Sequence, residues 1–294
     1  MKVGFIGMGR MGRGMAKRLV SAGHDLLVSD PIPEHVEELV KVGAVAADSP
    51  AAASLGRDVV ISMLPTDPVL DIVLHGDNGL IEHMPANCIH MASGTHGVAA
   101  VNAAADAHNK AAQTFIACPV LGRPDLAAEG LLKLVPAGPK AAIEIVRPLL
   151  DIIGQQTFEA GTNPQAAAAV KIANNFMLGC AIENMGEALS LVEKLGVEPE
   201  LFYKVITQGL FAAPAFEVYG QFIVDQNWDS HGATAVIGLK DADLALEAAQ
   251  AAGVPLPSLE IWRNYLQRAI DRGEGHLDWA VMAKEQARAS GLDK

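Results

Sequence analysis

Near-continuous apolar runs alternate with amphipathic helical patterns over the first half of the chain. We interpret these runs as strands at residues 2–6, 25–29, 58–64, 87–92, 114–120 and 131–136. Strands that are apolar at almost every position are typical of a parallel sheet that helices cover on both faces. The alternation therefore predicts an α/β domain built on a doubly wound sheet.

The alternation stops after Gly161. Beyond this point the pattern predicts only helices, at residues 163–196, 199–208, 214–225, 238–251 and 258–271. A run of strands followed by a run of helices indicates two domains. We therefore expect residues 1–162 to form the sheet domain and residues 163–294 to form an all-α domain.

The longest predicted helix would join the two domains. Ala, Leu, Met, Glu and Lys dominate it, and these residues are strong helix formers. Asn163 is suited to cap its start, Pro164 fits its first turn, and Gly196 can end it. Gly179 and Gly186 weaken its interior but allow another helix to approach closely. At about 1.5 Å per residue it would span roughly 45 Å, more than one small domain needs.

Lys171, Asn174 and Asn175 fall on one face of this helix, at positions i, i+3 and i+4. Ala, Ile and Met surround them, so an ammonium group and two amides would be partly buried there. Buried polar groups need partners. We expect these side chains at a site between the two domains; the alternative is a lysine on an exposed helix face.

The segment Gly7-Met8-Gly9-Arg10-Met11-Gly12 follows the first predicted strand and opens a helix. In a G-x-G-x-x-G motif the first glycine permits a tight turn and the second lets a pyrophosphate approach the backbone. The third lets the helix pack on the strand. The unpaired N–H groups at the helix N-terminus then face the phosphates. The motif predicts a Rossmann-type domain that binds a dinucleotide.

Asp30 ends the second predicted strand, close to the spacing at which an acidic residue accepts hydrogen bonds from an adenosine ribose. A carboxylate at this position would repel a 2′-phosphate, and no arginine follows it directly. This favours NAD over NADP. The alternative interpretation of Asp30 is a solvated residue in the turn with Pro31.

Ligands of parallel sheets bind at the carboxyl ends of the strands. Leu64, Pro65, Ser93 and Thr95 lie at such ends and are placed to contact the cofactor or substrate. His96 follows them and is a further candidate for substrate contact. His90, inside a predicted strand, is better interpreted as a hydrogen-bonded core residue.

Six further histidines show no metal-ligand spacing such as H-E-x-x-H. They are His24, His75, His83, His108, His231 and His276. The aromatic residues after position 210 are interpreted as helical core or interface, with one of them a candidate for the pocket wall. They are Phe211, Phe216, Tyr219, Phe222 and Trp228. We treat Arg263 and Lys284 as solvated charges.

Composition narrows the class of protein. The 294 residues are 50% hydrophobic and 19% charged, which is typical of a folded protein. The formal net charge of -12 argues against nucleic acid or an anionic membrane as a partner. No apolar run reaches the length of a membrane span, and the glycine motif begins too early for a signal peptide. We expect a cytoplasmic protein.

The cysteines, Cys88, Cys118 and Cys180, are far apart and lie in apolar runs. We interpret them as reduced core residues and expect no disulfide or metal site.

Four sequence blocks carry a resemblance to a known family. They are GFIGMGRMGRGMAKRL at the start, CPVLGRPDLAAEGLL at 118–132, KIANN at 171–175 and GLKDADLAL at 238–246. In this order the blocks resemble the β-hydroxyacid dehydrogenases, the family of 3-hydroxyisobutyrate dehydrogenase and tartronate semialdehyde reductase. The resemblance covers essentially the whole chain, and the lysine blocks are its most specific parts.

The resemblance implies an NAD(P)-dependent enzyme that transfers a hydride between nicotinamide and a small 3-hydroxy acid or its semialdehyde. The lysine matching Lys171 is the catalytic acid/base of the family, and the asparagine matching Asn175 positions the substrate. The lysine matching Lys240 lies near substrate and nicotinamide, and the Ser-Thr pair matching Ser93 and Thr95 contacts ligand. Asn174 would tie the long helix to a neighbouring element.

The substrate block departs from the family pattern. The usual Asp-Ala-Pro-Val-Ser-Gly-Gly is replaced by Ala117-Cys118-Pro119-Val120-Leu121-Gly122-Arg123. Leu121 would narrow the pocket. Arg123 would either bind a carboxylate through two hydrogen bonds or pair with Asp125. A second departure replaces the Gly-x-Gly run before the lysine by Gly161-Thr162-Asn163-Pro164.

During reduction, a Lys171 ammonium would protonate the developing alkoxide; during oxidation, the neutral amine would accept the hydroxyl proton. Burial and a second cation, Lys240, would lower its pKa toward working pH. An imine reductase is the first alternative; that class typically lacks this lysine, so Lys171 and Lys240 argue against it, whereas Leu121 leaves it open. The second is a non-catalytic scaffold, which would have no need of Lys171.

The long helix also predicts assembly. A helix longer than its own domain requires, and apolar around much of its circumference, tends to bury its surplus face on a partner chain. We therefore expect a homodimer, or a tetramer built from dimers, with the helical domains at the interface.

Overall fold

The computed structural model describes residues 1–229 and 232–292; His231 lies outside them. The chain divides into two compact units, Met1–Lys171 and Ile172–Lys294. The division falls inside the long helix, nine residues after the start expected for the second domain.

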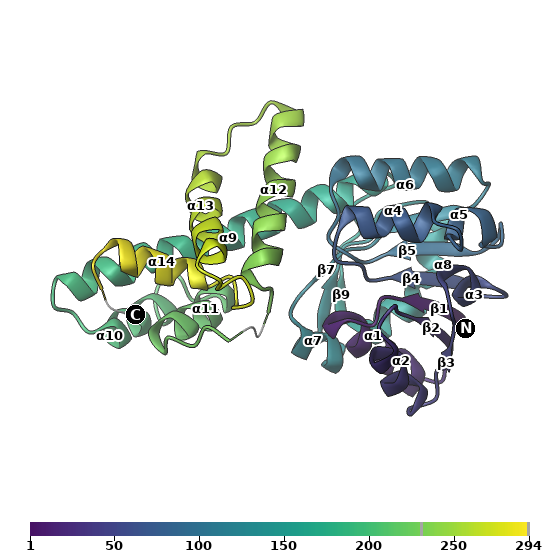
Figure 1. The fold of residues 1–294 in the computed structure, drawn as a ribbon, viewed down its shortest axis with the longest axis horizontal. Coiled ribbons are helices and arrows are strands. Elements are labelled where there is room, and N and C mark those ends of the chain that lie inside the picture. Colours follow the sequence, from purple (N-terminus) through teal and green to yellow (C-terminus); the bar gives the residue numbers. More distant parts are fainter. Residues whose placement is uncertain (230–231, 293–294) are drawn as a thin grey trace. The chain divides into compact units, whose positions relative to one another are not determined.

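The first unit contains a six-stranded parallel sheet with the strand order β3-β2-β1-β4-β5-β6 (Figure 1). Its strands are β1 (Lys2–Ile6), β2 (Asp25–Ser29), β3 (Val45–Ala46), β4 (Val59–Ser62), β5 (Ile89–Ala92) and β6 (Thr114–Ala117). Every pair of neighbours in it is parallel. The predicted doubly wound sheet is confirmed, with β3 as an edge strand that the pattern did not reveal.

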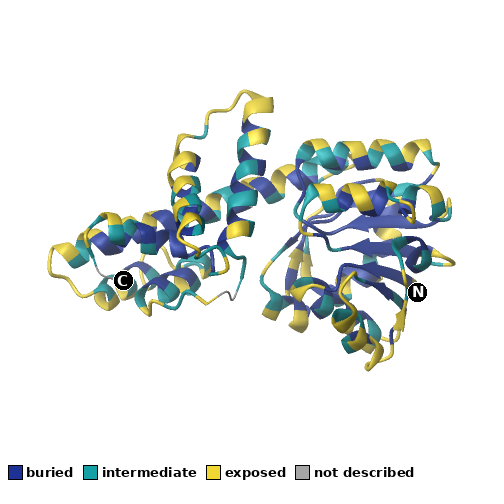
Figure 2. Ribbon diagram, in the orientation of Figure 1, coloured by how far each residue is buried: buried dark blue, intermediate teal, exposed yellow. Residues whose placement is uncertain are grey.

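Helices cover both faces of this sheet. On one face lie α1 (Arg10–Ser21), α2 (Pro33–Val40), α7 (Pro124–Glu129) and α8 (Lys140–Ile153). On the other face lie α3 (Pro50–Ser54), α4 (Asp67–His75), α5 (Leu80–His83) and α6 (Val98–Lys110). Val59 and Ile61 of β4 enter one core and Val60 enters the other, which explains the continuous apolar run. Figure 2 shows the strands buried between helices with exposed outer surfaces.

A second, three-stranded sheet corrects two predicted strands. It contains β7 (Val120–Leu121), β8 (Leu132–Leu134) and β9 (Gly154–Thr157), with β7 antiparallel to β8 and β8 parallel to β9. The run 114–120 is therefore two strands in different sheets, because Pro119 has no N–H to continue the first ladder. The run 131–136 does not join the main sheet. The polar sequence of β9 gave no apolar signal.

The long helix α9 (Pro164–Lys194) matches its prediction closely. The side-chain oxygen of Asn163 accepts a hydrogen bond from the Gln165 N–H at 3.2 Å, so the expected cap is present. Gly196 has a φ of 80°, the left-handed conformation that commonly follows a helix C-terminus.

The second unit is helical over its described residues. After α9 come α10 (Pro199–Thr207), α11 (Pro214–Val224), α12 (Ala235–Ala252), α13 (Pro257–Asp271) and α14 (Val281–Ala289), of which α14 was not predicted. The glycines of α9 allow the close approaches expected of them. A Cβ at Gly179 would lie 2.7 Å from the Trp262 ring of α13, and one at Gly186 would lie 2.9 Å from Ala283 of α14.

Lys284 is not the solvated charge that we expected. It pairs with Glu274 at 2.8 Å, and Arg288 pairs with the same carboxylate at 2.7 Å. Hydrogen bonds from Arg288 and Lys284 lower the pKa of Glu274 to about 2. Arg263, by contrast, is a partly exposed residue that pairs with Asp243.

The three cysteines are free thiols, and Cys88 and Cys118 are buried as expected. Burial raises the pKa of both to about 12, so these thiols are unreactive. In the described part of the chain no helix is both long and apolar enough to cross a bilayer.

Glu183 of α9 is a buried acid in the second unit. The residue is 4% exposed, and neither carboxyl oxygen has a hydrogen-bond partner among the described residues. Burial, reinforced by the nearby charge of Glu187, raises its pKa from 4.5 to about 8. The folded protein therefore retains this proton at pH values where the unfolded chain releases it.

We expect the second unit to lose stability as pH rises from 4.5 to 8, and Glu183→Gln to remove most of that loss. The proton on Glu183 favours the folded state at low pH, and a shift of this size corresponds to on the order of 4 kcal/mol. Urea unfolding at pH 5 and pH 8 measures this change in the free energy of unfolding. Tryptophan fluorescence reports on the second unit, because Trp228, Trp262 and Trp279 all lie in it. Glu247→Gln, at an exposed position of α12 whose charge does not contribute to the raised pKa of Glu183, is the control. Parallel pH curves for wild type and Glu183→Gln would contradict the assignment.

Candidate active site

The glycine loop connects β1 to α1, and two of its glycines are required by packing. Gly7 has a φ of 92°, and a Cβ there would lie 2.4 Å from the Met63 carbonyl oxygen. A Cβ at Gly12 would lie 1.9 Å from the carbonyl oxygen of Gly7. A Cβ at Gly9 would meet no atom within 4 Å. The backbone at Gly9 therefore faces open space of the kind that an approaching pyrophosphate needs.

The start of α1 offers backbone groups rather than side chains to such a ligand. Gly9 is the N-cap residue, and no side chain caps the helix. Met8 is fully buried, Met11 is partly buried against the first core, and Arg10 is exposed. An uncapped helix N-terminus beside an open loop fits the phosphates of a dinucleotide.

Asp30 is tied to the glycine loop. Its side chain is 8% exposed, so the alternative of a solvated turn residue is wrong. One carboxylate oxygen accepts a hydrogen bond from the Met8 N–H at 2.6 Å, and the other accepts from the Ile32 N–H at 2.9 Å. His35, which the sequence analysis did not consider, lies 3.3 Å from the second oxygen. A carboxylate has about four acceptor positions, so it can still accept from a ribose hydroxyl.

The loops after β4 and β5 are tied together by one carboxylate. Asp67, at the start of α4, accepts from the Gly97 N–H at 3.1 Å and from His96 Nδ1 at 2.9 Å. Leu64 and Ser93 are buried, Thr95 is partly buried, and Pro65 is exposed. The predicted contact residues thus lie on two connected loops at the carboxyl end of the sheet.

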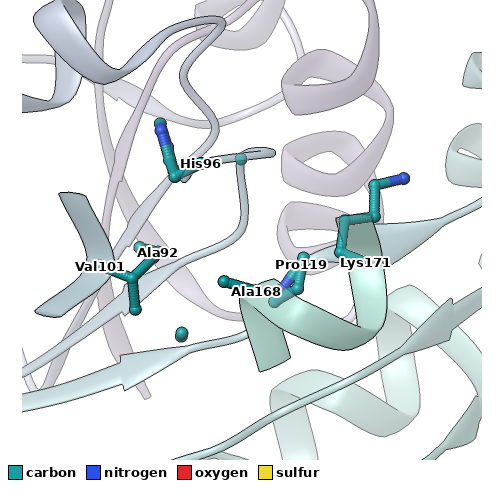
Figure 3. Close-up of a pocket in the computed structure, with 8 residues that line it drawn as sticks. Ala92, His96, Val101, Pro119, Ala168 and Lys171 are labelled. Carbon is teal, nitrogen blue, oxygen red and sulfur yellow. The ribbon is translucent and has the colours of Figure 1, made fainter. Parts of the chain in front are cut away.

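A small cavity lies beside these loops, within the first unit. It is lined by Ala92, Gly94, His96, Val101, Ala117, Pro119, Ala168 and Lys171 (Figure 3). Only His96 and Lys171 bring polar side chains to this lining. Figure 3 shows Lys171 and Ala168 on one helical turn, with His96 on a separate loop and the lysine nitrogen extending away from it.

His90 is the hydrogen-bonded core histidine that the sequence predicted. It contacts Ser62 Oγ at 2.9 Å and His108 Nε2 at 2.8 Å, and His108 Nδ1 contacts Gln113 at 2.8 Å. Burial lowers the pKa of His108 to about 4 and lowers that of His90 well below its ordinary value. Both rings therefore stay neutral at physiological pH.

The substrate block contributes less to the cavity than expected. Val120 and Leu121 pack on the two cores of the first unit, and Pro119 alone represents the stretch 119–123 in the cavity lining. Gly122 has a φ of 142°. Arg123 donates to Asp125 at 2.8 Å and lowers the pKa of that carboxyl. Arg123 was expected either to bind a substrate carboxylate or to pair with Asp125, and in the structure it pairs with Asp125.

In the second unit, a buried carboxylate joins two candidate residues. Asn175, 7% exposed, donates to Asp241 Oδ2 at 2.7 Å, and Lys240 pairs with Asp241 Oδ1 at 2.9 Å. Asn174 is exposed and donates only to its neighbour Asn175 among the contacts observed, at 3.2 Å. The expected tie from α9 to a neighbouring element is therefore made by Asn175. Asp241 was missed, although it lies inside the quoted block GLKDADLAL.

No group of three or more His, Cys, Asp or Glu side chains in the described ranges is placed to hold a metal ion. The parallel sheet, the open glycine loop and the lysine-lined cavity define a dinucleotide-binding oxidoreductase fold with a helical second unit.

Comparisons with known proteins narrow this class. A model of the NAD-binding domain of 6-phosphogluconate dehydrogenase matches residues 2–161. A model described as the NAD-binding region of NADP-dependent 3-hydroxyisobutyrate dehydrogenase matches residues 166–285. The chain belongs to the β-hydroxyacid dehydrogenase family, whose members are NAD(P)-dependent oxidoreductases acting on CH–OH groups.

Relatives cover the whole chain. An uncharacterized oxidoreductase of Bacillus subtilis is 38% identical, over 97% of this chain and 99% of its own length. A 3-hydroxyisobutyrate dehydrogenase of Pseudomonas aeruginosa is 31% identical, over 96% and 97%. The crystal structure of a 3-hydroxyisobutyrate dehydrogenase from Salmonella typhimurium superposes with a TM-score of 0.86 at 26% identity, covering 97% of this chain and 99% of that one.

We expect Asp30→Ala to weaken NAD binding by about tenfold or more and to weaken NADP binding less. The change removes an acceptor for the ribose hydroxyls, worth roughly 1.5–3 kcal/mol for a charged group, and removes repulsion of a 2′-phosphate. Loosening of the glycine loop through Met8 affects both cofactors, so the NAD-to-NADP affinity ratio, measured by calorimetry, is the readout. Glu34→Ala removes the same charge from an exposed position nearby and serves as control. An unchanged ratio in Asp30→Ala would rule out the assignment.

Proposed function

We propose that this protein transfers a hydride between the nicotinamide of NAD and the reacting carbon of a small 3-hydroxy acid or its semialdehyde, with Lys171 as general acid/base. The observation that carries the proposal is the position of Lys171. It lines a cavity at the carboxyl ends of β5 and β6, in the same unit as the open glycine loop.

The chain's own residues supply position and a proton. Bound NAD supplies the hydride chemistry, and the backbone of Gly7–Gly12 together with Asp30 would hold it. During reduction, the Lys171 ammonium would donate a proton to the oxygen that gains negative charge; during oxidation, the neutral amine would take it back. Asn175 would orient a substrate oxygen, with its amide held by Asp241.

The substrate class draws support from the relatives. The Pseudomonas aeruginosa protein is named for 3-hydroxyisobutyrate, and so is the Salmonella typhimurium structure. Against the imine reductase alternative, Leu121 packs on the core and is absent from the lining of the cavity that includes Lys171. The chain also has Lys171, which neither an imine reductase nor a non-catalytic scaffold would need.

We expect Lys171→Ala to reduce turnover by about a hundredfold to ten-thousandfold, the usual contribution of a general acid/base. Affinity for NAD should change by no more than a few-fold. NADH and NADPH oxidation is measured against methylmalonate, tartronate and succinic semialdehydes, glyoxylate and a cyclic imine. Lys133→Ala, at an exposed position of β8, is the control. Equal losses of turnover and NAD affinity would make Lys171 a structural residue; activity on the imine alone would refute the substrate class.

The second unit also has the surface expected of a subunit interface. Large apolar side chains are exposed at the end of α9, on α10 and on the turn that follows it. They are Leu191, Leu195, Leu201, Val205, Leu210 and Phe211, with Leu210 93% and Leu195 73% exposed. Contiguous exposed apolar residues mark interaction surfaces. We propose that a second copy of the chain covers them, in a homodimer or a tetramer of dimers.

Sedimentation at micromolar concentration should show a dimer or tetramer. Leu195→Glu should shift the protein toward the monomer without lowering the stability of the second unit, because the residue makes few contacts within its own chain. Leu55→Glu, at a 59% exposed position of the first unit, is the matched control. A wild-type monomer at this concentration would contradict the proposal.

A further inference from the structure

Two buried polar atoms of the first unit have no hydrogen-bond partner. Residues 1–171 are described throughout, and among their side chains only Ser93 Oγ and His96 Nε2 are buried without one. Both residues lie in the loop between β5 and α6. Leaving a buried polar group unpaired costs roughly 1–3 kcal/mol, so two such atoms in one short loop call for a physical cause.

The contacts of His96 determine which of its ring nitrogens carries hydrogen. Its side chain is 1% exposed, and Nδ1 lies 2.9 Å from Asp67 Oδ1. A carboxylate can only accept hydrogen bonds, so Nδ1 is the donor. In the neutral ring Nε2 then has a free lone pair and acts as an acceptor.

Gly94 makes room for this arrangement. A Cβ at Gly94 would lie 2.5 Å from His96 Nε2 and 2.4 Å from the carbonyl oxygen of Leu64. The acceptor nitrogen therefore lies against a residue that lines the cavity, where the loops after β4 and β5 meet. Gly94, His96 and Lys171 all contribute to that lining (Figure 3).

We propose that His96 is a positioning residue whose Nε2 accepts a hydrogen bond from an N–H or O–H group of the bound ligand. The Asp67 carboxylate holds the ring in the required tautomer. This proposal rests on the proposed function, since it assigns the ligand to the site that Lys171 shares. Two ligand groups carry such a donor beside the reacting carbon: the carboxamide of the nicotinamide, or a second hydroxyl on the hydroxy acid.

The test is His96→Asn. The asparagine amide can still donate to Asp67 from the position of Nδ1, but it has no atom at the position of Nε2. His96→Gln places a polar atom near the Nε2 position and should restore part of the effect. His83→Asn is the matched control, because His83 contacts the Gly79 carbonyl and does not line the cavity. Thermal unfolding of each variant checks that it folds.

Calorimetry distinguishes the two sources of the donor without requiring turnover. The first pair of ligands is NAD and its 3-acetylpyridine analogue, in which a methyl group replaces the carboxamide NH₂. The second pair is glycerate and 3-hydroxypropanoate, which differ by one hydroxyl, each titrated into the protein with NADH. In one of the two pairs, the wild-type protein should bind the ligand that carries the donor, NAD or glycerate, about 3- to 10-fold more tightly than the ligand that lacks it. This is the range of one neutral hydrogen bond.

Loss of the preference for NAD in His96→Asn assigns the donor to the carboxamide, and loss of the preference for glycerate assigns it to the substrate hydroxyl. If His96→Asn folds and leaves both ratios unchanged, the proposal is wrong and the Asp67–His96 pair only ties the loops. Failure of both hydroxy acids to bind would count against the proposed function, and the NAD pair would then decide alone.

Discussion

The first unit depends on how closely α1 approaches the end of β1. At Gly12 the backbone lies so near the carbonyl oxygen of Gly7 that a Cβ would be 1.9 Å from it. Any side chain there would push the helix away from the strand and move its first N–H groups. In the loop between them, Gly9 faces open space. The anion-binding geometry is thus a result of backbone packing and needs no charged side chain.

Three aspartates perform a similar task at separate places in the molecule. Asp30 links the end of β2 to the glycine loop, Asp67 links the start of α4 to the loop after β5, and Asp241 links α12 to Asn175 of α9. A carboxylate accepts several hydrogen bonds at once, so each can hold two segments together. In each case the segments held carry candidate ligand-binding groups.

Sequence periodicity was most informative where the physics is local. The first two strands and the long helix were predicted within a residue or two, because apolar runs, caps and terminal glycines act on adjacent residues. It failed at 114–120, where an apolar run contains two strands of different sheets divided by Pro119. It also failed for Lys284, whose ion pair with Glu274 depends on how α14 packs.

The sequence by itself determined the glycine loop, the α/β-then-helical order and the placement of Lys171 and Asn175 one turn apart on a single helix. Each of these follows from residue types at short, regular spacings. Only the tertiary structure decided that Met8 would bind Asp30, that His96 would pair with Asp67, and that Asn175 would donate to Asp241. These partners are 22, 29 and 66 residues apart, so their meeting depends on how the strands and helices pack, which no local pattern records.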